Sequence, residues 1–105
     1  MPILHMVLFK LKPGVTEDQL ADLRKTGETL VGQVPGLQSW RLGGVLPSTA
    51  HRAQGFDMAI VTVMDDEAAV LAYGPNPLHK VVQAKRLEIC TDTIVYDMPV
   101  DASPL

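Results

Sequence analysis

Three residues of this sequence combine the chemistry of an acid–base site: His5, Tyr73 and His79. A histidine exchanges its proton near neutral pH, and a tyrosine hydroxyl can donate a hydrogen bond to an oxygen that gains negative charge. In a shared apolar pocket, His79 would be the general base that removes a proton from an acidic C–H bond. Tyr73 would bind the resulting enolate oxygen, and His5 would support them.

Each of these residues also has a purely structural interpretation. His79 follows a helix break and can hydrogen-bond to the backbone there, while Tyr73 can simply fill a core. His5 lies among apolar neighbours, where a buried imidazole must find a partner or stay neutral. The residue types alone leave both interpretations open, and the elements that position the three side chains decide between them.

Composition limits the other classes of function. The net charge is −3, and the lysines and arginines are scattered, so there is no clustered basic face for nucleic acid. No apolar run approaches the ~20 residues of a membrane span. The opening residues also lack the basic region of a secretory signal. We therefore expect a cytoplasmic protein that binds neither nucleic acid nor membranes.

The sequence gives little support for a metal or another cofactor. Cys90 is the single cysteine, which excludes an intramolecular disulfide and a cysteine-based zinc cage. His5, His79 and a carboxylate such as Asp57 would be needed for a two-histidine site, and no pair of these has ligand spacing on one element. We predict that the protein uses no metal and no cofactor.

The first predicted element is a strand over residues 3–11 that is apolar at nearly every position. Such a strand is covered on both faces. Alternation places one set of side chains on one face (Ile3, His5, Val7 and Phe9) and a second set on the other (Leu4, Met6 and Leu8). His5 is therefore expected on the same face as part of the core.

Cap and turn residues mark the later elements. Thr16 and Gln19 form a capping-box pattern that starts a helix, and its apolar positions continue to Val34 before Pro35–Gly36 ends it. Asp66 caps a short helix that reaches Tyr73, and a second helix covers residues 78–87 after a break rich in proline. The remaining predicted segments are strands over 37–46, 56–64 and 92–98, with a polar connection over 47–55.

The order of these elements, β-α-β-β-α-β, predicts an α+β ferredoxin-like fold with an antiparallel four-stranded sheet. We expect one domain over residues 1–98 and a C-terminal tail over 99–105. Helices on one side of the sheet leave a second, apolar side uncovered, and an exposed patch of that size is unfavourable. A homodimer that packs sheet against sheet would bury it.

Several segments resemble the stress-responsive dimeric α/β-barrel family along the whole chain. They are the opening run His5–Lys12, the junction Val34–Leu37, the strand start Gly55–Asp57, and a helical signature in which Asp66–Ala69 is followed by Tyr73 and Asn76–His79. Asn76 stands where the family's His-Pro-x-His pattern begins with histidine. The resemblance implies two chains that form a dimeric barrel.

Among members of that family, the polyketide cyclases suggest what the residues do. The resemblance implies cofactor-independent aldol-type cyclisation, or related proton-transfer or lyase chemistry, on a small substrate with an apolar tail. His79, Tyr73 and His5 match the working positions of those cyclases. The predicted substrate-binding residues lie around them: Val7, Phe9, Leu23, Gly27, Met58, Ile60 and Val82. The alternative is a non-enzymatic stress-associated barrel that binds a small molecule.

Overall fold

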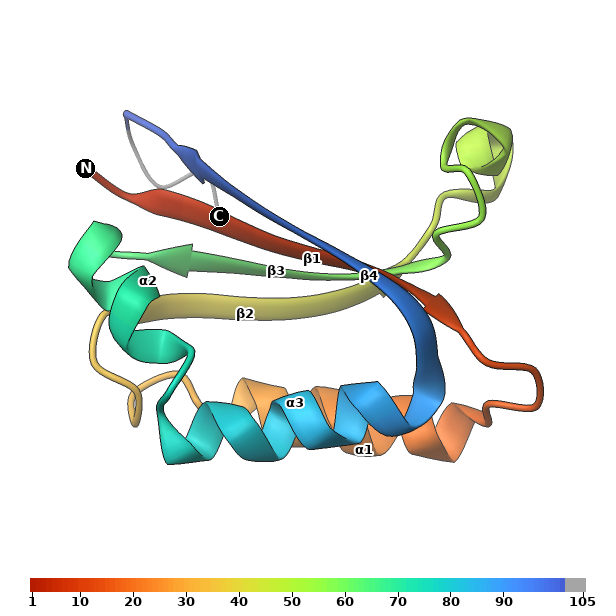
Figure 1. The fold of residues 1–105 in the computed structure, drawn as a ribbon, viewed down its shortest axis with the longest axis horizontal. Coiled ribbons are helices and arrows are strands. Elements are labelled where there is room, and N and C mark those ends of the chain that lie inside the picture. The colour runs from red at the N-terminus through yellow and green to blue at the C-terminus, as the bar shows by residue number, and fades with distance from the viewer. Residues whose placement is uncertain (102–105) are drawn as a thin grey trace.

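The computed structural model describes residues 1–101. The chain follows the predicted β-α-β-β-α-β plan, with the second helical region divided in two by the Gly74–Asn76 break (Figure 1). The strands are β1 (Ile3–Leu11), β2 (Leu37–Gly44), β3 (Met58–Met64) and β4 (Cys90–Pro99). The helices are α1 (Glu17–Glu28), α2 (Glu67–Tyr73), α3 (Pro77–Ile89) and the short 3-10 helix η1 (Pro47–Arg52).

The four strands form one antiparallel sheet in the order β2-β3-β1-β4, and α1 and α3 run side by side across one of its faces (Figure 1). The ferredoxin-like fold is therefore confirmed. The two central strands of the sheet are β1 and β3, and these helices cover them on that face. Directly paired residues share a face of the sheet, so the pairing of His5 with Thr62 on one side and Asp97 on the other places all three toward the helices.

The cap residues act as the sequence predicts. The Thr16 side chain accepts from the Gln19 N–H at 3.2 Å, and the Gln19 side chain accepts from the Thr16 N–H at 2.8 Å. Asp66 caps α2 through the Ala69 N–H at 2.9 Å. These bonds satisfy amide donors that the first turn of a helix cannot pair internally, and they fix where α1 and α2 begin.

The prediction that the first helix extends to Val34 is wrong. The helix α1 ends at Glu28, and the chain continues in turns in which the Leu30 N–H donates to the Gly27 carbonyl at 3.0 Å. Gly32 adopts a φ of 90°, which a right-handed helix cannot contain. Leu30 and Val34 are still buried, so the apolar spacing is that of a folded turn packed on the core.

Other boundaries differ more modestly from the prediction. The polar connection contains η1, β3 starts at Met58, and β4 starts at Cys90, which is buried. The strand β4 continues to Pro99, and the Val100 N–H donates to the Pro2 carbonyl at 2.9 Å. Regular pairing thus runs past the predicted domain end at residue 98, and residues 102–105 of the predicted tail lie outside the described residues.

The two faces of the sheet have different surroundings. The inner face packs against the helices and supplies the core, including Val7, Phe9 and Ile60. By the strand register, the outer sheet face is formed by apolar side chains of the three strands β1, β3 and β4: Leu4, Met6, Leu8, Ala59, Val61, Val63, Ile94, Tyr96 and Met98. Tyr96 is 59% exposed and Ile94 is 47% exposed, so part of this apolar face is open to solvent in the single chain.

Candidate active site

A cavity of about 100 Å³ lies between the inner sheet face and α3. It is lined by residues of six elements: His5, Val7, Trp40, Ile60, Tyr73, His79, Val82, Gln83, Arg86 and Val95. Val95 lies on the edge strand β4 and is 53% exposed, so the cavity opens to solvent there. The structure therefore brings His5, Tyr73 and His79 together around one space, although His5 is distant from the other two in sequence.

His79 is held in the tautomer that a general base requires. Its Nδ1 lies 3.1 Å from the Gly74 carbonyl oxygen. A carbonyl only accepts hydrogen bonds, so Nδ1 carries the hydrogen and Nε2 of the neutral ring keeps its lone pair. Burial lowers the pKa of His79 below its ordinary 6.5, the Gly74 carbonyl acts in the opposite sense, and nearby His5, Arg86 and Lys80 lower it further. The neutral, basic form therefore predominates at pH 7.

Tyr73 lies at the end of α2, directly against His79. The two ring centroids are 4.1 Å apart with a 41° tilt, which is a stacking contact. Burial raises the pKa of Tyr73 to about 12, and the nearby indole N–H of Trp40 lowers it only in part. The phenol therefore stays protonated at physiological pH and is available as a hydrogen-bond donor.

His5 is oriented by a carboxylate that sequence reasoning missed. Its Nδ1 lies 2.5 Å from Oδ1 of Asp97 on β4, and its ring meets Tyr73 edge-on with centroids 5.8 Å apart. Since a carboxylate only accepts, Nδ1 of His5 donates and Nε2 is free to face the other rings. The available signal was a single acidic residue inside the apolar run Ile94–Met98, but its partner depends on the β1–β4 register.

Trp40 is the second residue whose position the sequence did not reveal. It is 5% exposed, and its Nε1 has no hydrogen-bond partner among the described residues. The indole N–H lowers the pKa of Tyr73, but no hydrogen bond joins the two side chains. The ring packs directly over Gly27, where a Cβ would overlap with it. The space that Gly27 leaves is thus filled by Trp40.

The predicted substrate-binding residues divide into two groups. Val7, Ile60 and Val82 line the cavity beside the three candidate catalytic residues. The other four, Phe9, Leu23, Gly27 and Met58, are buried in the surrounding core and do not form its wall. Phe9 and Leu23 are almost fully shielded from solvent, and Met58 is the first residue of β3. Contact of these four with a substrate stays a prediction.

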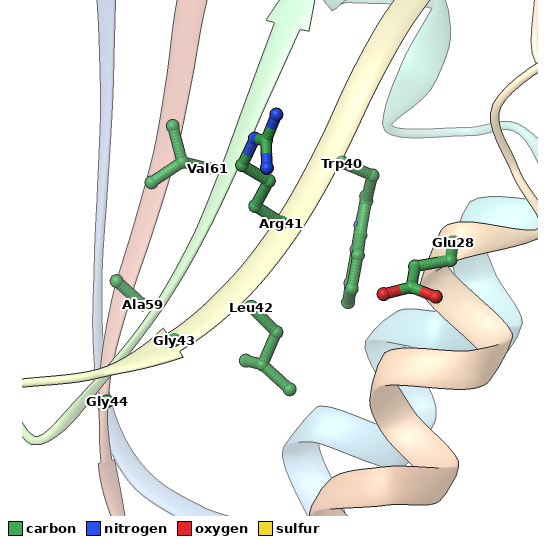
Figure 2. A pocket seen from close by; sticks show the side chains of 8 residues that line it. All are labelled: Glu28, Trp40, Arg41, Leu42, Gly43, Gly44, Ala59 and Val61. Atoms are coloured by element: carbon green, nitrogen blue, oxygen red, sulfur yellow. The ribbon is translucent and has the colours of Figure 1, made fainter. Parts of the chain in front are cut away.

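A larger hollow of about 570 Å³ lies along the open edge of β2, and Glu28 is the one carboxylate among its lining residues. Figure 2 shows Glu28 and Trp40 on one side of this strand and Arg41, Ala59 and Val61 on the other. No histidine or tyrosine lines it. The smaller cavity is therefore the better candidate for catalysis, and the indole of Trp40 borders both spaces.

In the described part of the chain, no three His, Cys, Asp or Glu side chains gather in a way that would hold a metal ion. Across residues 1–101, no helix has the length and apolar character needed to cross a membrane.

Comparisons with known proteins agree with this architecture. A solved dimeric ferredoxin-like protein of unknown function from Thermobifida fusca superposes with a TM-score of 0.79 at 26% identity, covering 95% of this chain and 92% of that one. The hydroxynitrile lyase of Passiflora edulis superposes with a TM-score of 0.81 at 19% identity, covering 98% and 97%. The second likeness shows a shared fold alone.

Sequence comparison gives the family. An uncharacterized protein of Streptomyces coelicolor is 32% identical over 91 residues, which cover 85% of this chain and 91% of that protein. Residues 3–100 match the family described as Stress responsive A/B Barrel Domain, which is the resemblance that the motifs indicated. The chain belongs to the stress-responsive A/B barrel domain family.

Proposed function

We propose that this protein is a cofactor-independent acid–base enzyme that moves a proton on a small carbonyl compound, in the manner of the family's polyketide cyclases and lyases. One observation carries the proposal. A neutral His79 with a fixed tautomer and a protonated Tyr73 border the same cavity in direct contact. A base and a donor placed side by side are what removal of a proton next to a carbonyl requires.

The proposed step begins at Nε2 of His79. This nitrogen takes the proton from a carbon next to a carbonyl, and the electron pair of the broken C–H bond moves onto the carbonyl oxygen as an enolate. The hydroxyl of Tyr73 donates to that oxygen, and the unpartnered N–H of Trp40, which lines the same cavity, would be a second donor. The enolate carbon then attacks a second carbonyl carbon, or the enolate forms a C=C bond as a leaving group departs from the neighbouring carbon. Protonated His79 gives its proton to the resulting alkoxide or leaving group.

The His5–Asp97 pair supports this step because Asp97 holds the imidazole of His5 in place at the cavity. Asp97 holds the His5 ring through Nδ1, and the ring lies edge-to-face with Tyr73. Such a hydrogen bond fixes both the tautomer and the orientation of an imidazole. We propose that His5 orients the substrate or Tyr73 and is not the primary base.

The motifs and the fold give independent support for this class of chemistry. In olivetolic acid cyclase, to which the motifs are similar, the corresponding positions are a tyrosine and a histidine of the second helical region and a histidine of the first strand. One protein of this fold, from Passiflora edulis, is named a hydroxynitrile lyase. Neither identifies a substrate for this chain.

We also propose that the working form is a homodimer. The outer sheet face is apolar over three strands and partly open, and two chains packed through it would remove that surface from water. The similar Thermobifida fusca protein is described as dimeric.

The test is proton exchange on a model substrate. Ethyl 2-methylacetoacetate has one acidic C–H between two carbonyls, and its replacement by deuterium in D₂O is followed by NMR. The protein should accelerate exchange, and His79→Ala should reduce the acceleration by about 10²-fold or more while remaining folded. His51→Gln, which changes an exposed histidine of η1, should match the parent protein. Binding of the ester without accelerated exchange would favour the non-enzymatic alternative.

A further inference from the structure

Arg86 is a buried cation without an anionic partner. It is 9% exposed, and its hydrogen bonds go to neutral groups, Oγ1 of Thr93 at 2.7 Å and Sγ of Cys90 at 3.7 Å. The ion pairs found among residues 1–101 are His5–Asp97, Lys10–Asp92 and Lys85–Asp22, and none includes Arg86. A buried guanidinium with no carboxylate is unfavourable unless something else supplies the negative charge.

The guanidinium belongs to the wall of the candidate active site. Arg86 lines the cavity together with His79 and Val82, and their spacing places all three on one face of α3. Asp97 lies beside this lining but is already bound to His5. The cavity therefore has a cationic donor at Arg86 and two neutral donors at Tyr73 and Trp40, with no acidic side chain among its lining residues.

We infer that the cavity binds a small oxo acid, with the carboxylate held by Arg86 and the keto oxygen facing Tyr73 and Trp40. The apolar walls formed by Val7, Ile60 and Val82 would contact the carbons between these groups. A volume of about 100 Å³ corresponds to about three water molecules at ~30 Å³ each, which suits the head of such a compound. This inference rests on the proposed function, since it names the substrate class of the same site.

A matched pair of ligands tests the inference without requiring turnover. 4-Oxopentanoate and 4-oxopentanamide have nearly the same shape, and only the first carries a negative charge. Titration of each into labelled protein is followed by ¹H–¹⁵N NMR. We expect the acid to bind about tenfold more tightly than the amide, because a charge-assisted bond to Arg86 contributes more than a neutral one. Equal affinities, or no shifts at cavity residues, would overturn the inference.

Variants assign the preference to Arg86. Arg86→Gln should bind acid and amide equally well, whereas Lys80→Gln, which removes the same charge from an exposed position on α3, should keep the preference. Thr93→Val removes the hydroxyl that anchors Arg86 but leaves its charge, so it should keep most of the preference. If Arg86→Gln misfolds, Arg86→Lys provides the decision: retained preference for the acid supports a charge interaction, and its loss with an intact fold contradicts it.

The two proposals fail in different ways. His79→Ala should still prefer the acid, because the base is not needed for binding. Suppose that it does, and that His79→Ala also accelerates deuterium exchange on the ester as much as the parent protein. Then the proposed function is wrong and the oxo-acid site stands. If His79 is needed for exchange but acid and amide bind alike, only the oxo-acid inference is wrong.

Discussion

The Gly74 carbonyl oxygen lies 3.1 Å from Nδ1 of His79. This contact joins the break between α2 and α3 to the chemistry of the cavity, because it decides which imidazole nitrogen holds a proton. The same break places Tyr73 as the last residue of α2, and Asn76 begins α3 by accepting from the Leu78 N–H at 2.9 Å. Two short helices separated by one turn therefore bring a donor and a base into contact, which one continuous helix would not do.

The first prediction concerns pH. Because burial lowers the pKa of His79, proton exchange should rise with pH through a value below 6.5 and be constant at neutral pH. NMR titration of the His79 ring should give the same pKa. The unfolded chain takes up this proton first as pH falls below 6.5, so the native state should also lose stability in that range. A ring that titrates at or above 6.5 would contradict the assignment of His79 as base.

The second prediction concerns Tyr73→Phe. This change removes one donor and keeps the ring that stacks on His79, so the fold should be retained while exchange slows by about 10²-fold. Because the pKa of Tyr73 is raised to about 12, the parent protein should show no loss from phenol ionisation below pH 10. Tyr96→Phe, which removes a hydroxyl from the outer sheet face, is the matched control. Unchanged exchange in Tyr73→Phe would exclude the oxyanion role.

The third prediction concerns the His5–Asp97 pair. If Asp97 acts only by holding His5, then Asp97→Asn, His5→Gln and the double variant should reduce exchange by similar factors. Rates measured on the four proteins give the coupling directly. Effects that multiply would mean that the two residues act separately.

The fourth prediction concerns Gly27→Ala. Alanine gains about 1 kcal/mol over glycine in a helix, but its Cβ would overlap with the indole of Trp40. Overpacking costs about 1–3 kcal/mol, so we expect a net loss in the free energy of unfolding measured in urea. Gly43→Ala, where no atom lies within 4 Å of the added Cβ, should be tolerated. Stabilisation by Gly27→Ala would show that Trp40 moves freely.

The fifth prediction concerns the outer sheet face. Tyr96→Arg should convert a dimer into a monomer in analytical ultracentrifugation, because it places a charge in the proposed contact. Leu71→Arg changes an exposed apolar residue of α2, which lies on the other side of the sheet, and should leave the mass unchanged. A parent protein that sediments as a monomer would contradict the homodimer.

The fold was predictable because its signals are local. Thr16 and Asp66 mark helix starts, the break after Tyr73 marks a helix end, and the apolar alternation of residues 3–11 marks a buried strand. These signals depend on a residue and its close neighbours in sequence. Leu30 and Val34 show where apolar spacing fails to predict a helix, because apolar residues at helical spacing also occur in a turn that packs on a core.

The candidate site was predictable only in part, for a related reason. Tyr73 and His79 are close in sequence, but Asp97 becomes a partner of His5 only through the register of two strands from opposite ends of the chain. Arg86 is buried, although long cationic side chains are usually solvated. Its burial follows from the packing of α3 on the sheet, and the unpartnered N–H of Trp40 likewise follows from tertiary packing.

Trp40 lines two spaces of very different size, the cavity of about 100 Å³ and the hollow of about 570 Å³. The small cavity also contains the candidate acid–base residues, and Figure 2 shows Trp40 among the residues that line the larger hollow along β2. We expect the packing of Trp40 on Gly27 to limit how far a bound molecule extends toward β2, although neither side chain exchanges a proton. A smaller residue at position 40 should widen the small cavity and admit longer molecules while leaving His79 unchanged, so substrate length and acid–base chemistry would depend on different residues.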